Sequence, residues 1–122
     1  MSHVSMGHGG SSGLESRPPT VEDLVRLCRD LNSAGAQYIV IGGMAMIRAG
    51  FVRATEDIDL LIEGSETNQK RAREALSMLP DNAVKEMKPD DLDTYVVVRV
   101  ADEIVVDILK SAAGVDYNGA KS

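Results

Sequence analysis

The sequence predicts a domain of the α/β (α+β) class, in which helices pack against a small mixed β-sheet. Three observations support this prediction. Segments with helical and with strand-like apolar spacing alternate along the chain, and the last two strand-like segments are separated by a short turn. The composition of the 122 residues, with 43% hydrophobic and 26% charged side chains, is typical of one compact domain.

The first part of the chain, residues 1–17, is rich in glycine and serine and is predicted to be a flexible N-terminal tail. Its stretch Gly9–Gly13 resembles an engineered linker. The folded domain is therefore expected to span residues 18–122. It begins with a helix that Thr20 can cap in a capping box with Asp23. An apolar stripe at helical spacing is expected to face the core: Val21, Leu24, Val25, Leu27, Cys28 and Leu31.

Two strands and a short helix are predicted next. The apolar and largely β-branched run Tyr38–Ile41 is typical of a strand covered on both faces. Gly42-Gly43 should end this strand, and residues 44–49 contain good helix formers. After a loop, the run Asp57–Ile62 is predicted to form the second strand.

The remaining elements are predicted from capping residues and from β-branched runs. Ser65 or Thr67 can cap a helix that ends at Pro80, and residues 81–93 are expected to form a loop with room for helical turns. The runs Tyr95–Val100 and Ile104–Leu109 should form an antiparallel hairpin with its turn at residues 101–103. Residues 111–122 resemble the start of a helix or a frayed end.

Charge and cysteine content restrict the classes of function. A net charge of -6 argues against non-specific binding to a nucleic-acid backbone, which depends on basic patches. The single cysteine, Cys28, excludes an internal disulfide framework and fits a reducing compartment, so a cytoplasmic location is expected. The longest apolar stretch is too short to cross a membrane, so no membrane partner is expected.

Three aspartates in apolar strands are the candidate catalytic and metal-binding residues. Side chains two residues apart on a strand share a face, so Asp57 and Asp59 should project together while Ile58 and Leu60 point the other way. Asp107 interrupts a later apolar run in the same manner. Grouped carboxylates repel one another and favour a hard divalent cation such as Mg2+, which typically also binds substrate phosphates. Three carboxylates can surround two such ions, as in two-metal phosphoryl transfer.

A glycine turn is the candidate phosphate-binding part of the same site. Gly42 and Gly43 lie between a predicted strand and a predicted helix, where backbone amides can approach an anion closely. Arg53 and Thr55 precede the acidic strand and are expected to contact a triphosphate, Arg53 by its charge and Thr55 by its hydroxyl.

These motifs resemble the polymerase-β-like nucleotidyltransferase superfamily, whose signature is similar to Gly42-Gly43, then Asp57-Ile58-Asp59, then Asp107. The runs 41–45 and 53–59 are most similar to the AbiEii-type and minimal nucleotidyltransferase branch, many of whose members belong to bacterial toxin–antitoxin or phage-defence systems. The resemblance implies the nucleotidyltransferase fold and transfer of a nucleoside monophosphate from a nucleoside triphosphate to a hydroxyl, with Mg2+ or Mn2+ held by the three aspartates. The implied acceptor is a tRNA, a protein or a small molecule.

The sequence departs from this family in two respects. Many relatives have Gly-Ser where this chain has Gly42-Gly43, so a phosphate-binding hydroxyl is absent and weaker triphosphate binding is expected. Larger relatives also have a C-terminal helical region that helps to form the acceptor pocket. We therefore expect the acceptor site to involve a partner protein, a homo-oligomer or a further segment.

Two other interpretations remain open. The first is a non-catalytic nucleotide-binding or assembly module of the same fold, acting with a partner protein. The second is a nucleotide-sugar glycosyltransferase, in which Asp-x-Asp also holds a metal and a diphosphate. Such transferases generally need a larger sheet than 122 residues supply.

Overall fold

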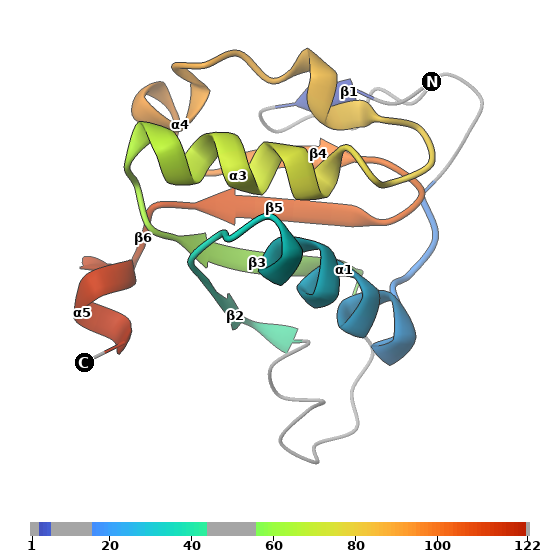
Figure 1. Ribbon diagram of the computed structural model, residues 1–122, viewed down its shortest axis with the longest axis horizontal. Helices are drawn as coiled ribbons and strands as arrows, with labels where there is room; N and C mark the ends of the chain where they lie inside the picture. The colour runs from blue at the N-terminus through green and yellow to red at the C-terminus, as the bar shows by residue number, and fades with distance from the viewer. Residues whose placement is uncertain (1–2, 6–15, 44–55, 122) are drawn as a thin grey trace.

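The computed structural model describes residues 3–5, 16–43 and 56–121, and these residues form a mixed α+β fold. The main sheet has five strands, and Figure 1 shows helices packed against it. The strands of this sheet are β1 (His3–Ser5), β2 (Tyr38–Ile41), β3 (Asp57–Ile62), β4 (Val98–Ala101) and β5 (Val105–Leu109). The longer helices are α1 (Val21–Ser33) and α3 (Glu66–Leu76). This architecture confirms the predicted class of a small mixed sheet with helices.

The sheet has the strand order β1-β4-β5-β3-β2. Its centre is the parallel pair β3 and β5, while the other neighbouring strands are antiparallel. The hairpin of β4 and β5 confirms the predicted antiparallel pair, although its turn lies at residues 102–104 rather than at 101–103. The two central strands therefore run in the same direction, and Asp57 of β3 lies beside Val105 of β5 where they begin.

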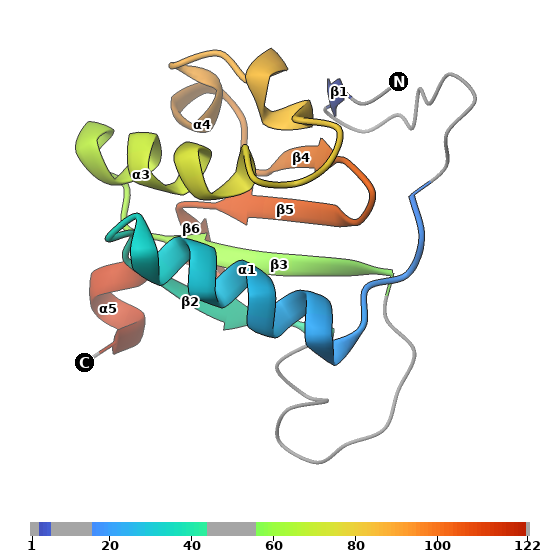
Figure 2. The same cartoon turned by 45° about the vertical axis from the view of Figure 1, so that its right-hand side comes forward.

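The helices α1 and α3 pack beside each other on one face of the sheet (Figures 1 and 2). Alternate residues of the central strands point toward these helices, so Ile58 and Leu60 of β3 and Val106 and Ile108 of β5 are at most 1% exposed. The other face of these two strands is left for the aspartates. This division of the two faces confirms the predicted orientation of β3.

Helix α1 begins and ends as predicted. Thr20 is its N-cap, and its side chain and that of Asp23 form a reciprocal capping box. Gly35 follows the helix with a φ of 77°, a conformation that glycine adopts without strain. The prediction that the whole apolar stripe faces the core is wrong in part, however, because Val21 and Val25 are more than 40% exposed. The core side of the helix is narrower than the sequence pattern indicated.

Other segments complete or modify the predictions. Ser65 caps α3. The predicted loop before β4 contains two helical turns, η1 (Ala83–Glu86) and α4 (Asp91–Thr94). After β5 the chain forms the short strands β6 (Ser111–Ala112) and β7 (Val115–Asp116) and then α5 (Tyr117–Lys121), where a helix start or a frayed end was expected.

Two predictions about strands need correction. The strand β2 lies at an edge of the sheet and is half-buried, so it is not covered on both faces. No element was predicted before residue 18, yet His3–Ser5 forms the strand β1, which pairs with β4. Arg17, the last residue of the predicted tail, is also hydrogen-bonded to the folded domain, since its backbone N–H donates to the Glu103 carbonyl at 2.9 Å.

The predicted helix over residues 44–49 lies outside the described residues. Among the described helices, none has the length and apolar character that crossing a membrane requires.

Candidate metal centre

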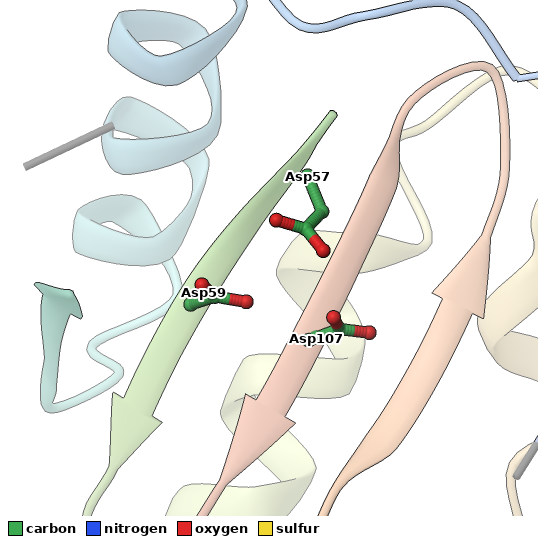
Figure 3. Close-up of side chains that lie close together, drawn as sticks. All are labelled: Asp57, Asp59 and Asp107. Carbon is green, nitrogen blue, oxygen red and sulfur yellow. The ribbon is translucent and has the colours of Figure 1, made fainter. Parts of the chain in front are cut away.

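The three predicted aspartates lie together on the sheet face opposite α3 (Figure 3). Asp57 and Asp59 are two residues apart on β3, and Asp107 is on the parallel neighbour β5. Asp59 and Asp107 are paired directly in the register of these strands, which brings their side chains to the same face at the same level. The pairing of β3 with β5 therefore brings Asp59 and Asp107 together, although they are far apart in the sequence.

One carboxylate oxygen from each aspartate lies within 4.8 Å of the others. Asp57 and Asp59 are half-buried, whereas Asp107 is buried in the centre of the sheet. Mg2+ prefers oxygen donors and usually keeps several water or phosphate ligands beside one or two carboxylates, so its site stays partly open. Two accessible carboxylates and one buried carboxylate fit this need, so the donor set suits Mg2+ or Mn2+.

Gly42 borders the same carboxylates at the end of β2. Its φ of 76° is in the left-handed region, and a Cβ atom built on it would collide with Oδ2 of Asp59. Glycine is thus required here both by the backbone conformation and by the close approach of the carboxylate. The predicted glycine turn does adjoin the acidic cluster, with its backbone against Asp59.

A residue that the sequence interpretation missed, Arg99, completes the cluster. It lies on β4 directly opposite Asp107 in the register of the hairpin. Its Nε donates to Oδ1 of Asp107 at 2.9 Å, and its Nη2 donates to Oδ2 of Asp107 at 3.0 Å and to Oδ2 of Asp57 at 3.2 Å. Arg99 therefore partly neutralises the cluster with a two-pronged ion pair to Asp107.

The electrostatics of the cluster are unfavourable without a cation. Burial, reinforced by the charges of Asp57 and Asp107, raises the pKa of Asp59 to about 6 from an ordinary value of 3.8. Burial and the adjoining Asp107 carboxylate also raise the pKa of Asp57. The hydrogen bond to Asp107 raises the pKa of Arg99, so this side chain stays charged. Additional positive charge would stabilise the ionised aspartates.

A cavity of about 270 Å³ adjoins the cluster on the side of Arg99. It is lined by Ser16, Arg17, Pro18, Glu56, Asp57, Arg99 and Val105. Arg17 is fixed in this wall by ion pairs to Asp23 at 2.6 Å and to Glu103 at 2.9 Å. The glycine turn lies next to Asp59 on one flank of the cluster, and this cavity lies on the other flank.

The structure thus brings together Asp57, Asp59, Asp107 and Gly42, with Gly43 following Gly42 in the same turn. Arg53 and Thr55 lie outside the described residues, so their predicted triphosphate contacts stay predictions.

No protein family, curated protein or solved structure matched the chain in three separate comparisons. The functional argument for this chain therefore depends on the chemistry of the site itself.

Proposed function

We propose that the chain is a metal-dependent nucleotidyltransferase with the nucleotidyltransferase fold. It would move a nucleoside monophosphate from a nucleoside triphosphate to a hydroxyl acceptor. The proposal is carried by one observation, the convergence of Asp57, Asp59 and Asp107 from two adjacent parallel strands, with oxygens within 4.8 Å of one another. Three carboxylates at this spacing are suited to two divalent cations.

Each side chain has a distinct part in this proposal. Asp57 and Asp59 are the accessible donors and would hold the ion that accompanies the triphosphate. Asp107 is buried and would hold the ion beside the attacking hydroxyl, for which it is also a candidate base. When bound, the two ions would activate the attacking oxygen and stabilise the leaving pyrophosphate.

The glycine turn supports the same assignment. The backbone at Gly42 borders Asp59 without a side chain between them, so a phosphate bound at the turn would lie next to the carboxylates. Gly43, Arg53 and Thr55 are proposed as further triphosphate contacts.

A transfer assay tests this function. The protein is incubated with each of the four α-labelled nucleoside triphosphates, Mg2+ or Mn2+, and separate acceptor pools of RNA, protein and small molecules. We expect label to enter one pool with the wild-type chain and not with Asp59→Asn. Asp93→Asn is a matched control, since Asp93 is an exposed acid paired with Lys110. Absence of label in every pool would remove the support for an enzyme.

The second candidate function is a non-catalytic module that binds nucleotide or assembles with a partner protein. Arg99 favours this alternative, because its ion pairs neutralise Asp107 and Asp57 without a metal. This candidate predicts a stoichiometric complex with a partner or a nucleotide and no transfer of label. Both candidate functions are compatible with a role in a toxin–antitoxin or phage-defence system. The neighbouring genes would distinguish such a role from the modification of a small molecule.

A further inference from the structure

Arg99 occupies the carboxylates that the proposed function assigns to metal ions. Both oxygens of Asp107 accept hydrogen bonds from its guanidinium, at 2.9 and 3.0 Å, and one oxygen of Asp57 accepts a third at 3.2 Å. The pair with Asp107 is two-pronged and shorter, and Asp107 is the more buried partner, with a side chain 9% exposed against 28% for Asp57. The guanidinium is therefore held mainly by Asp107.

A metal ion at this site would compete with the guanidinium of Arg99 for the carboxylate of Asp107. An ion bound by Asp107 and its neighbours would lie close to a fixed positive charge, and the two cations would repel each other. Arg99 also uses one lone-pair site on each oxygen of Asp107, about half of the sites that this carboxylate offers to an ion.

Arg99 has room to move away. Its side chain is 46% exposed and borders the cavity of about 270 Å³, whose wall also includes Glu56. Its backbone is fixed by the pairing of β4 with β5, so only the side chain needs to turn. Glu56 offers a carboxylate beside the cavity for the displaced guanidinium.

We propose that Arg99 is a displaceable internal cation, which holds Asp107 and Asp57 in position in the metal-free protein and must leave Asp107 before a metal ion binds there. The inference rests on the proposed metal site. It implies that the first metal ion binds at Asp57 and Asp59. The second ion then binds at Asp107 and breaks the ion pair between Asp107 and Arg99. Arg99 is thus a positioning residue for the carboxylates.

Titration of the full chain with Mn2+ alone, without nucleotide, tests the proposal. Arg99→Met removes the competing charge at similar side-chain length and should tighten Mn2+ binding about tenfold, because hydrogen bonds to a charged group no longer have to be broken. Arg99→Lys keeps the charge but cannot form the two-pronged pair, so its affinity should lie between those of the wild type and Arg99→Met. Lys110→Met, which removes an ion pair with Asp93, should leave the affinity unchanged.

The outcomes separate the inference from the proposed function. Unchanged or weaker Mn2+ binding by Arg99→Met, or an Arg99→Lys affinity equal to that of the wild type, would overturn the role of Arg99 and leave the metal site intact. Absence of Mn2+ binding in all the proteins would overturn the metal site as well. A merely structural role for Arg99 predicts weaker binding in the variants, which is the opposite direction.

A second measurement follows the side chain of Arg99 in the wild-type protein. The Nε–H signal of Arg99 in the wild-type protein, assigned by its absence in Arg99→Lys, should move toward the position of a solvent-exposed arginine as Mg2+ is added. A signal that stays in place while Mg2+ binds would contradict displacement.

Discussion

Asp59 and Asp107 face each other across the parallel pair β3 and β5, each the direct register partner of the other. This pairing is costly for two carboxylates, since like charges directly opposite on a sheet destabilise it. Asp57 adds a third negative charge to the same face. Arg99 offsets part of this repulsion through its ion pairs, and a divalent cation would offset more, so the cluster has several measurable consequences.

Asp59→Asn should abolish Mg2+-dependent triphosphate binding and leave the fold intact. The substitution removes a ligand charge from a half-buried position while preserving the shape of the side chain. Calorimetric titration with triphosphate and Mg2+ measures the effect, with Asp93→Asn as the control. An unchanged affinity would count against the metal assignment.

Asp107→Asn should reduce turnover more than triphosphate binding. The buried Asp107 is proposed to act at the attacking hydroxyl, so its charge matters mainly in the transition state. The measurement compares kcat with the dissociation constant of the triphosphate for the variant and the wild type. Equal losses in the two quantities would argue that Asp107 is only a binding ligand.

The pH dependence of stability should show the raised pKa of Asp59. Its folded-state pKa of about 6 is above its ordinary value of 3.8, so between these values the folded state binds more protons than the unfolded state. The free energy of unfolding of the metal-free protein should therefore decrease by about 1 kcal/mol from this group as the pH rises from 4 to 7, after allowance for solvent screening. Denaturation curves of Asp59→Asn should lack this contribution, and saturating Mg2+ should reverse it in the wild type. Identical pH profiles for the two metal-free proteins would contradict the shift.

Strand periodicity and the motif were sufficient to single out the three aspartates. The two-residue spacing on a strand fixes Asp57 and Asp59 on one face, and an acid inside an apolar run indicated Asp107. Their mutual proximity depends on the parallel pairing of β3 with β5, which the sequence did not specify.

Arg99 was missed because of a one-residue error in the hairpin turn. A turn at residues 101–103 would place Val97 opposite Asp107, whereas the actual turn at 102–104 places Arg99 there. Moving the turn by one residue shifts the cross-strand partners by two, so the partner of Asp107 could not be read from the pattern, and a single charge in an apolar strand was an insufficient signal. The edge strand β1 was missed for another reason, since a short polar segment gains strand structure only through its pairing with β4.

Gly42→Ala should weaken metal binding about tenfold as well as destabilise the fold. Alanine would have to adopt a φ near 76° and would also push the Asp59 carboxylate from its position. Gly114→Ala is a matched control, because Gly114 has a φ of 80° but open space around a Cβ atom. Both variants should lose about 1–2 kcal/mol of stability from the left-handed backbone, and only Gly42→Ala should lose Mn2+ affinity. Equal behaviour in the Mn2+ titration would show that Asp59 tolerates the methyl group.

Asp102 should contribute much more to stability than the neighbouring acid, although the sequence indicated only a turn residue. Its side chain is 3% exposed and accepts backbone N–H groups from Asp81 at 2.9 Å, Ala83 at 2.8 Å and Glu103 at 2.7 Å. These bonds attach the segment that leads into η1 to the β4–β5 turn. Asp102→Ala leaves the buried N–H of Ala83 and two part-buried N–H groups without this acceptor, and should lower the free energy of unfolding by about 3 kcal/mol.

The neighbouring acid provides the control for Asp102. Glu103 is 43% exposed and pairs with Arg17 at the surface, so Glu103→Ala should cost less than about 1 kcal/mol. Chemical denaturation of both variants at pH 7 measures the difference. Similar small losses would mean that solvent replaces the Asp102 carboxylate, and that the attachment of η1 to the hairpin depends on apolar packing instead.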